Sequence, residues 1–315
     1  MAELPLVVAL GVVDPALVEP TLADHARFVA RPTDDDLAEA QGAIVRADPL
    51  VDKAFLDRMP KVRVLARTGV GVERVDLRTA TERGIAVVVT PGAGTTAVAE
   101  GAIGMAMHLI KRFGRLTALV RDGRWAQRAS VPVGDLDGAV LGVIGFGRIG
   151  QRAAALGAAL GMTVLAYDPV SQPPADVRCA DLADLIRRSD VLTLHLPLLE
   201  STHHLVNETL LAQVKRGAVL VNCGRGGLVD LDAVHAALLA GRLGGVGLDV
   251  FDPEPPAHHP LFDHPDVLLT PHVMGLSRRA TAATFTAAAE GVVAVLTGGR
   301  PEAVANPDWN TEPVA

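Results

Sequence analysis

The chain has 315 residues, of which 49% are hydrophobic and 21% are charged, and its formal net charge at pH 7 is −7. This composition is typical of a globular protein long enough for two domains, and it excludes a disordered chain. The negative balance, together with the lack of any block of basic residues, argues against nucleic acid or an anionic membrane as a partner.

The cysteine content and the apolar stretches indicate where the protein resides. Cys179 and Cys223 lie in different segments without the spacing of a metal site, so we expect no metal, no disulfide framework and a reducing compartment. The first residues lack the positively charged region of a secretory signal. No apolar stretch reaches the ~18 residues that a membrane span needs. The sequence therefore predicts a cytoplasmic protein.

Short apolar runs alternate with helical patterns along the whole chain. A first series of candidate strands covers residues 6–10, 43–46, 62–66 and 85–89. A second series covers residues 140–144, 163–167, 191–194, 219–222, 245–248 and 267–269. Runs that are apolar on both faces and separated by helices indicate buried parallel strands with right-handed crossovers. Because there are too many strands for one ordinary doubly wound sheet, we predict two α/β domains.

Two helical segments are expected to carry the chain between these domains. Residues 95–112 are rich in Ala, Met and Ile and follow a turn signal at 90–94. Residues 277–297 form a second helical pattern after the last strand, and we expect it to return the chain to the first domain. Residues 306–315 are expected to be a tail.

The predicted domain boundaries follow from these crossovers. The first domain is discontinuous and comprises residues 1–95 and 277–315, while the second comprises residues 96–276. Ligands of two-domain enzymes commonly bind in the cleft between the domains, so we expect a site there.

A glycine-rich motif stands between the first strand of the second series and a helical stretch. Gly145 allows a tight turn, Gly147 lets the backbone approach a pyrophosphate, and Gly150 lets the helix pack against the sheet. The amino end of that helix then faces phosphates. A glycine-rich turn without a ligand is the alternative, which the strand–turn–helix–strand–acid context disfavours.

Asp168 closes the next candidate strand and indicates which dinucleotide binds. A carboxylate there can accept hydrogen bonds from the ribose hydroxyls of NAD, whereas it would repel a 2′-phosphate. The four residues after Asp168 include no arginine that would pair with such a phosphate. The sequence therefore predicts NAD rather than NADP.

Three polar residues stand at or after the ends of later strands. Arg225 lies in a glycine-rich loop, Glu254 lies in a proline-stiffened loop, and His272 follows the last strand. In a parallel sheet these loops open at the carboxyl edge, where a dinucleotide also binds. Imidazole can exchange a proton with a substrate oxygen, glutamate can hold its other nitrogen, and arginine can pair with a carboxylate. Each residue alone could be a surface charge, but together they predict an oxidoreductase for a hydroxy or keto acid.

At this point the chain resembles the D-isomer-specific 2-hydroxyacid dehydrogenases along nearly all of its length. The motifs that carry the resemblance are RTGVGVERVDL (67–77), VVTPGAGTTAVAEGAIG (88–104), GVIGFGRIGQ (142–151), LTLHLPLLESTHHLVN (192–207), VNCGRGGLVD (221–230), GLDVFDPEP (247–255) and TPHVMG (270–275). The resemblance implies an α/β protein with two doubly wound parallel-sheet domains: a Rossmann domain for NAD and a flavodoxin-like substrate domain, with a cleft between them.

The resemblance also assigns roles to individual residues. The family's catalytic arginine, glutamate and acid–base histidine fall on Arg225, Glu254 and His272. Its cofactor contacts fall on Thr96, Arg148, Ile149, Asp168, Pro197, Thr202, Cys223, Gly224 and Asp249, to which we add the three motif glycines Gly145, Gly147 and Gly150 together with Arg225 and His272. The substrate carboxylate is expected on the amides of Val70 and Gly71, with Arg46, Arg225 and His272 nearby.

The substrate and the assembly remain open at this stage. We favour a small anionic 2-keto acid of the glyoxylate or hydroxypyruvate type. Near the expected carboxylate loop the first domain offers Arg46, Arg67 and Arg74, which are not clustered in sequence, and the domain has few large aromatic residues. The alternative substrate is 3-phosphoglycerate, and the alternative of another class is an NAD-sensing binding or regulatory protein. Residues 116–136 are long for a connection, and the resemblance implies that they reach a second subunit, which predicts a homodimer.

Overall fold

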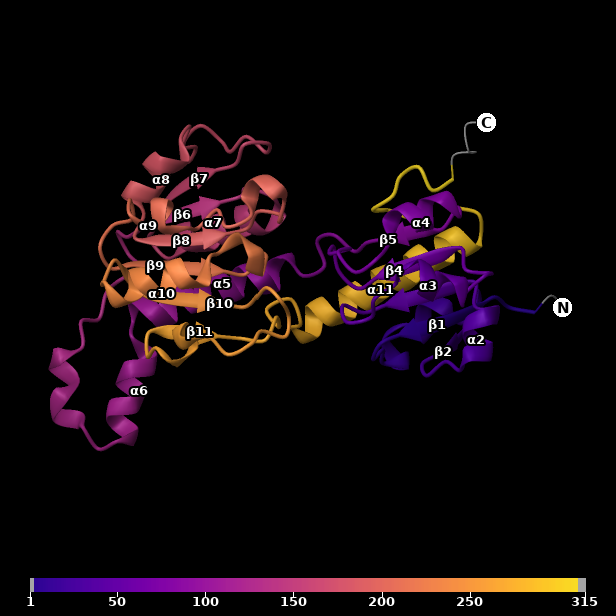
Figure 1. Ribbon diagram of the computed structural model, residues 1–315, viewed down its shortest axis with the longest axis horizontal. Coiled ribbons are helices and arrows are strands. Elements are labelled where there is room, and N and C mark those ends of the chain that lie inside the picture. Colours follow the sequence, from indigo (N-terminus) through magenta and orange to yellow (C-terminus); the bar gives the residue numbers. More distant parts are fainter. Residues whose placement is uncertain (1–2, 311–315) are drawn as a thin grey trace. The chain divides into compact units, whose positions relative to one another are not determined.

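The computed structural model describes residues 3–310. Within them the chain forms two compact units, of which unit 1 comprises residues 3–94 and 277–310 and unit 2 comprises residues 95–276 (Figure 1). Each unit is built on its own parallel β-sheet with helices on its faces. The prediction of two parallel-sheet α/β domains is therefore confirmed.

Unit 1 has a five-stranded sheet in the order β2-β1-β3-β4-β5. Its strands are β1 (Leu6–Leu10), β2 (Arg27–Val29), β3 (Gly42–Val45), β4 (Val64–Arg67) and β5 (Ala86–Val88). Its helices are α1 (Glu19–Leu22), α2 (Asp34–Glu39), α3 (Lys53–Asp57), α4 (Leu77–Glu82) and α11 (Arg278–Leu296), with the short 3-10 turn η1 (Pro15–Leu17) before α1.

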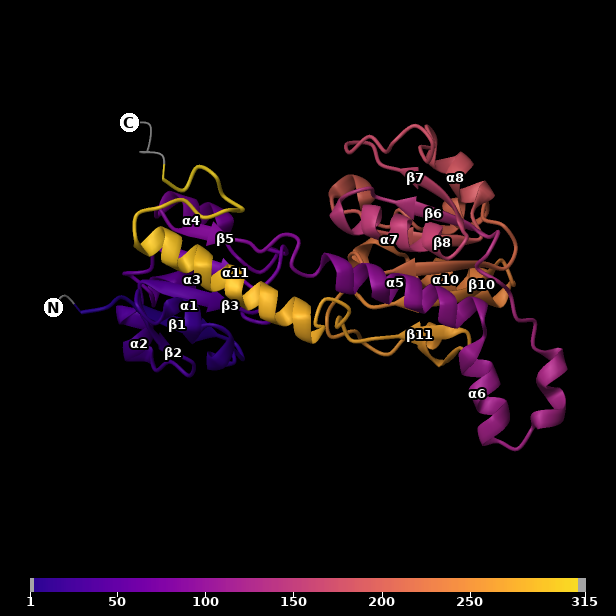
Figure 2. The ribbon, with the colours of Figure 1, turned by 180° about the vertical axis from the view of Figure 1, so that it is seen from behind.

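The long helix α11 covers one face of this sheet, where it packs against β3, β4 and β5 (Figure 2). Its first turn is capped by Ser277, whose hydroxyl accepts a hydrogen bond from the Ala280 amide at 3.2 Å. Phe285 and Val292 project from it into the core between helix and sheet. Burial of this apolar face is what returns residues 277–310 to unit 1.

Two details of unit 1 differ from the sequence-based expectation. Strand β2 was not predicted, because it has only three residues, lies at the sheet edge and starts with an exposed arginine. The predicted tail at 306–315 is wrong at its first residue: the Asn306 side chain is 6% exposed, accepts from the Val87 amide at 2.8 Å and donates to the Ile85 carbonyl at 2.9 Å. Residues 311–315 lie outside the described part.

Unit 2 has a six-stranded sheet in the order β11-β10-β9-β8-β6-β7. Its strands are β6 (Val140–Ile144), β7 (Thr163–Tyr167), β8 (Val191–Leu194), β9 (Ala218–Asn222), β10 (Leu243–Leu248) and β11 (Val267–Leu269). Its helices are α5 (Thr95–Ile110), α6 (Phe113–Arg121), α7 (Arg148–Ala159), α8 (Leu182–Arg188), α9 (Glu208–Leu211) and α10 (Leu231–Leu239), with the 3-10 turns η2 (Trp125–Ser130), η3 (Glu200–Thr202), η4 (Gly226–Leu228) and η5 (Pro260–Asp263).

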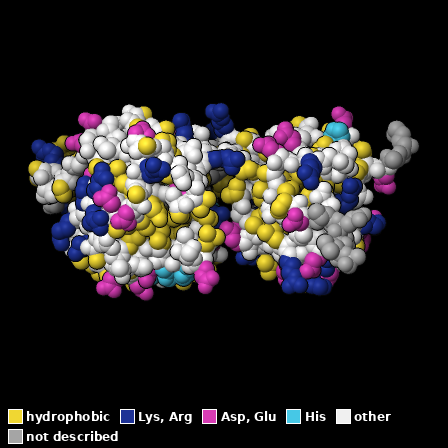
Figure 3. All heavy atoms as spheres, turned by 90° about the horizontal axis from the view of Figure 1, so that it is seen from above, with side chains coloured by type: hydrophobic (Ala, Val, Ile, Leu, Met, Phe, Trp, Pro, Cys, Tyr) yellow, Lys and Arg dark blue, Asp and Glu magenta, His cyan; other side chains and the backbone are white. Residues whose placement is uncertain are grey.

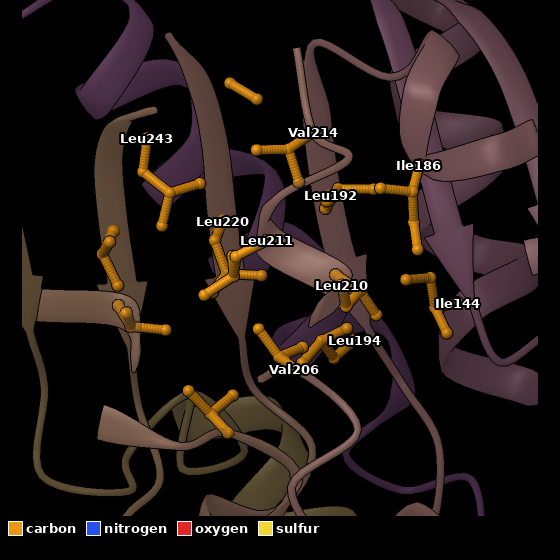
Figure 4. Packing of buried hydrophobic residues seen from close by; sticks show 14 of the residues in the cluster. Ile144, Ile186, Leu192, Leu194, Val206, Leu210, Leu211, Val214, Leu220 and Leu243 are labelled. Atoms are coloured by element: carbon orange, nitrogen blue, oxygen red, sulfur yellow. The ribbon is translucent and has the colours of Figure 1, made fainter. Parts of the chain in front are cut away.

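Alternate residues of the unit 2 strands supply two cores, one on each face of the sheet. On one face, Leu192, Leu194 and Leu220 pack with residues of α8 and α9 (Figure 4). On the other face, Val143 and Val221 pack beneath α5 and α7. Because the sheet is buried on both faces, only its edges and strand ends are available for polar side chains.

The strand order of unit 2 locates the place where a ligand is expected. Chain order runs outward in opposite directions from β6 and β8, which are neighbours in the sheet. In doubly wound sheets this reversal opens a crevice at the carboxyl ends of the strands. A ligand is therefore expected beside the loops after β6 and β8.

The surface of both units is mixed in charge on the face shown in Figure 3, where Lys and Arg side chains alternate with Asp and Glu. Among the described residues, no helix is both long and apolar enough to cross a membrane. No group of three or more His, Cys, Asp or Glu side chains suited to a metal ion occurs within residues 3–310.

Candidate active site

The glycine-rich turn after β6 has the backbone geometry of a phosphate-binding turn. Gly145 has a φ of 95°, which disfavours any residue with a Cβ, and a Cβ on Gly150 would lie 2.0 Å from the Gly145 oxygen. Gly147 is the N-cap of α7, and a Cβ added there would meet open space. Arg148 and Ile149 are the first residues of α7 and therefore form a helix amino end that a phosphate can approach.

Asp168 lies directly after β7 and is fixed beside this turn. Its Oδ2 accepts from the Phe146 amide at 2.7 Å, and its Oδ1 accepts from the Val170 and Ser171 amides, each at 2.8 Å. The carboxylate is thus oriented by the backbone, and Oδ2 keeps one lone pair for a further donor. A ribose hydroxyl is the donor that the sequence predicts there, and this arrangement has room for it.

The loop after β8 carries two predicted cofactor residues, Pro197 and Thr202. The Thr202 hydroxyl donates to the Pro197 carbonyl at 2.8 Å and accepts from the Leu199 amide at 2.8 Å. Thr202 therefore stabilises this loop by hydrogen bonds to the backbone of the loop itself. On α5, Thr96 is the second residue of the helix, within the turn whose amides have no helical partner.

Cys223, which follows β9, is a buried thiol. Burial, and secondarily the negative charge of Asp249, raise the pKa of Cys223 to about 12. Its Sγ lies 3.9 Å from the Met105 Sδ of α5. The side chain therefore stays protonated near neutral pH and is a packing group, so a cofactor contact of Cys223 would have to come from its backbone.

The loop that carries Arg225 is fixed by Asn222 and Gly226, two residues to which we assigned no role from the sequence. Asn222 is fully buried; its Nδ2 donates to the Arg225 carbonyl at 2.8 Å and its Oδ1 accepts from the Gly224 amide at 3.0 Å. A Cβ on Gly226 would lie 2.0 Å from the Phe251 carbonyl carbon, so only glycine lets this loop touch the loop of Glu254. The half-buried Arg225 side chain also donates to the Gly224 carbonyl at 2.9 Å. The position of Asn222 two residues before the first glycine of VNCGRGG was the available sequence signal.

Glu254 and His272 form the central contact of the site. Glu254 Oε2 lies 2.8 Å from His272 Nδ1, while Oε1 accepts from the Phe251 amide at 2.9 Å. Because a carboxylate only accepts, Nδ1 carries the proton and Nε2 is left for a substrate oxygen. The His272 side chain is 48% exposed, so that nitrogen is accessible. This is the arrangement of an oriented acid–base histidine.

In unit 1, the loop after β4 presents backbone amides, as the sequence predicts for Val70 and Gly71. Buried Arg67 donates from Nε to the Gly71 carbonyl at 2.8 Å and from Nη1 to the carbonyls of Val45 and Arg46. Over the described residues, neither the Val70 nor the Gly71 amide donates to another group of the chain. These two amides are therefore available to an anion.

Arg46 follows β3, next to the same loop. Its Nη1 lies 3.5 Å from the Thr68 hydroxyl, and its guanidinium carbon lies 5.4 Å from the centre of the Phe285 ring. Arg67 is among the cations that the sequence offers near this loop, but the residue is only 6% exposed and its guanidinium donates to backbone carbonyls. It is not free to bind a phosphate.

A cavity of about 210 Å³ lies among the same loops of unit 2, lined by Asn222, Gly226, Phe251 and Asp252 together with His204 and His259. Arg225, Glu254 and His272 do not line it. We therefore do not assign the substrate to this cavity.

Comparison with known proteins bears on these observations. Residues 103–274 match the family described as D-isomer specific 2-hydroxyacid dehydrogenase, NAD binding domain. The D-3-phosphoglycerate dehydrogenase of Methanocaldococcus jannaschii is 35% identical over 86% of this chain and 53% of its own length. The chain thus spans about half the length of the phosphoglycerate dehydrogenases that it matches.

Two further relatives are covered more completely. The hydroxypyruvate reductase of Thermotoga maritima is 36% identical over 75% of this chain and 78% of that enzyme. The crystal structure of D-lactate dehydrogenase from Aquifex aeolicus, complexed with NAD and lactic acid, superposes with a TM-score of 0.80 at 28% identity, over 93% of this chain and 96% of that one.

These matches define the class of protein. The chain belongs to the D-isomer specific 2-hydroxyacid dehydrogenase family, and unit 2 contains the family's NAD-binding domain. The predictions of the family and of NAD as cofactor are confirmed.

Proposed function

We propose that the chain is an NAD-dependent dehydrogenase that interconverts a small 2-keto acid and its D-2-hydroxy acid. The observation that carries this proposal is the 2.8 Å contact between His272 Nδ1 and Glu254 Oε2 at the carboxyl edge of the NAD-binding domain. NADH, when bound, supplies the hydride. The residues of the chain then have to orient the keto acid and move one proton.

Each of the three proposed catalytic residues has a separate task. His272 donates the proton from Nε2 to the carbonyl oxygen as the hydroxy acid forms, and takes it back in the reverse direction. Glu254 holds Nδ1 and stabilises the imidazolium. Arg225 pairs with the substrate carboxylate and polarises the carbonyl, because its planar fork matches a carboxylate.

We propose that Arg46, Val70 and Gly71 of unit 1 contribute to binding the substrate carboxylate. The free amides of Val70 and Gly71 support this role, since oriented N–H groups bind anions. Glyoxylate or hydroxypyruvate is favoured over 3-phosphoglycerate, because Arg67 is committed to backbone carbonyls, which leaves Arg46 and Arg74 of the three cations that the sequence offers near this loop. The T. maritima hydroxypyruvate reductase and the M. jannaschii phosphoglycerate dehydrogenase represent the two possibilities among the relatives.

Rates of NADH oxidation with a panel of keto acids test both the activity and the substrate. We expect the largest kcat/KM with hydroxypyruvate or glyoxylate. A ten-fold or greater preference for 3-phosphohydroxypyruvate, about 1.4 kcal/mol of transition-state binding, would favour the phosphoglycerate alternative. Tight NADH binding without turnover of any keto acid would instead support an NAD-sensing binding protein.

We further propose that Asp168 makes the enzyme prefer NAD to NADP. Its fixed carboxylate would repel a 2′-phosphate, and the amides that orient it are already paired. Asp168→Ala should weaken NADH binding and narrow the difference between NADH and NADPH. Equal use of the two cofactors by the wild-type protein would contradict this role.

We also propose a homodimer formed through unit 2. In Figure 1, α6 and the turn after it stand out from the sheet of this unit. Val120 and Trp125 are both 62% exposed there, and large exposed apolar side chains are typical of interfaces. Light scattering at micromolar concentration should give the mass of a dimer, and a monomer mass would contradict the proposal.

Finally, we propose a cytoplasmic location. Cys179 and Cys223 are free, buried thiols, which suits a reducing compartment. Fractionation of the source cells tests the location, and recovery in an exported fraction would exclude it.

A further inference from the structure

The turn that carries His272 is built around one buried carboxylate, that of Asp249. Oδ1 accepts from the Thr270 hydroxyl at 2.6 Å and from the Val273 amide at 2.9 Å. Oδ2 accepts from the Met274 amide at 3.1 Å. The Asp249 carbonyl accepts from the His272 amide at 2.8 Å as well. Asp249 thus contacts the residues on both sides of His272 and His272 itself.

His272 needs this support because its backbone is strained. Its φ of 54° lies in the left-handed region, which costs a residue with a side chain about 1–2 kcal/mol. A residue in such a conformation stays there only when its surroundings fix it. A single carboxylate holds the donors at 270, 273 and 274 in fixed positions. The backbone of residue 272 between them is thereby kept in the left-handed conformation.

The far end of the turn is fixed by packing against α5. A Cβ on Gly101 would lie 2.3 Å from the Met274 sulfur, so the Met274 side chain occupies the space above this glycine. The Met274 amide and its side chain are therefore both committed, the first to Asp249 and the second to α5.

Asp249 uses most of its acceptor capacity inside the turn and keeps one lone pair of Oδ2 for a further donor, as Asp168 does. It is 2% exposed, and both lone pairs of Oδ1 and one of Oδ2 are used by the turn. Burying a carboxylate is costly unless donors compensate it, and here the turn supplies those donors. An asparagine would fill the same space but would turn an NH2 group toward a donor.

We propose that Asp249 is the positioning residue of His272: it holds the imidazole in the left-handed turn where Nδ1 meets Glu254. This inference rests on the proposed function for its catalytic meaning, but its geometric part can be tested without turnover. Its role is distinct from the cofactor contact that the sequence resemblance assigns to Asp249.

The test compares Asp249→Asn with a matched control, Asp190→Asn. Asp190 is also a loop carboxylate of unit 2 that accepts from a backbone amide, that of Val140 at 2.8 Å, but it precedes β8 at the opposite edge of the sheet. For each variant we would measure kcat and KM for the best keto acid, the Kd of NADH by fluorescence, and the 15N shift of His272 Nδ1. The His272 signal is assigned by its loss in His272→Asn.

For Asp249→Asn we expect kcat at saturating NADH to fall ten-fold or more, and by a larger factor than the Kd of NADH rises. The Nδ1 signal should move toward its position in Glu254→Gln, because the contact with Glu254 is lost. Asp190→Asn should leave all three quantities near those of the wild type. Thr270→Val, which removes one donor and keeps the shape, should move the signal in the same direction by a smaller amount and covers the case in which Asp249→Asn does not fold.

Two results would overturn the proposal. One is an unchanged Nδ1 signal in both Asp249→Asn and Thr270→Val. The other is a loss of NADH affinity with kcat preserved at saturation, which would make Asp249 a cofactor ligand. If the wild-type protein turns over no keto acid, the proposed function fails, and the Nδ1 signal still decides whether Asp249 positions His272.

Discussion

A buried charged residue orders the loops at the carboxyl edge of each sheet, but the two charges have opposite sign and leave different groups exposed to a ligand. In unit 2, the Asp249 carboxylate gathers hydroxyl and amide donors of the turn after β11. In unit 1, the Arg67 guanidinium gathers carbonyls of Val45, Arg46 and Gly71. Each buried charge is satisfied by hydrogen-bonding groups at the ends of nearby strands and in the loops after them, as burial requires.

The sign of the buried charge decides what each loop presents to a ligand. Around Arg67 the carbonyls point inward, so the amides of Val70 and Gly71 are left to bind an anion. Around Asp249 the amides point inward, and the loop presents the His272 side chain instead. We therefore expect changes in unit 2 to affect kcat and changes in unit 1 to affect KM.

The largest effect is expected for His272→Ala. Loss of the proton donor should lower kcat about 10²–10⁴-fold, the range typical of general acid catalysis, with the Kd of NADH nearly unchanged. Steady-state kinetics and NADH fluorescence measure the two quantities. His258→Ala is the control, because His258 Nε2 also contacts a carboxylate, that of Asp263 at 3.2 Å, but lies outside the site. Retained activity in His272→Ala would mean that another group supplies the proton.

Arg225→Lys should have the next largest effect. A lysine keeps the charge but cannot make the planar two-pronged contact with a carboxylate, so kcat/KM should fall roughly 10²-fold. Arg242→Lys serves as the control, since Arg242 also donates to a carbonyl at 2.9 Å, that of Ala212, on the surface of the same unit. Equal kcat/KM in Arg225→Lys and the wild type would remove Arg225 from the mechanism.

Arg46→Ala tests the expectation that changes in unit 1 affect KM. We expect KM for the keto acid to rise about ten-fold, which equals about 1.4 kcal/mol, while kcat stays within about three-fold. The matched control is Arg58→Ala, because Arg58 lies over the Phe55 ring at 5.2 Å much as Arg46 lies over that of Phe285. A fall in kcat with KM unchanged would reverse the roles that we give the two edges.

The sequence predicted the strands best where the pattern is apolar throughout. Strands β1, β6, β7, β8 and β11 have the predicted bounds to the residue. Both β11 and the missed β2 are three-residue edge strands, but β11 is apolar throughout, whereas β2 starts with an exposed arginine. An apolar run identifies a strand, while a short strand with a polar residue is decided by its neighbour in the sheet.

The site shows the same division between what is local and what is not. Loops after neighbouring parallel strands open at one edge, so the sequence could bring Glu254 and His272 together, and the structure places them in contact. The hydrogen bonds between Asp249 and the turn after β11 join residues 21 to 25 positions apart. They also require the left-handed backbone conformation of His272, which the sequence pattern does not reveal. Arg67 was considered among the cations near the substrate loop, and only the structure shows its guanidinium turned inward.

The smallest effect is expected from His195, which directly follows the carboxyl end of the interior strand β8. Burial lowers the pKa of His195 from 6.5 to about 4. Its Nε2 lies 3.0 Å from the Thr193 hydroxyl, and its buried Nδ1 has no hydrogen-bond partner within the described chain. The folded protein thus keeps this imidazole neutral where the unfolded chain would protonate it.

The sign of the pH dependence follows from this difference. Above pH 6.5 both states are neutral and stability is complete; as the pH falls from 6.5 toward 4, only the unfolded state gains the proton, and stability is lost. One proton corresponds to a slope of at most about 1.4 kcal/mol per pH unit. Urea unfolding of the wild type and of His195→Asn at pH 7, 6 and 5 should show a shallower loss in the variant, whereas the exposed His258→Asn should follow the wild type. Identical slopes for the wild type and His195→Asn would mean that His195 is not held neutral in the fold.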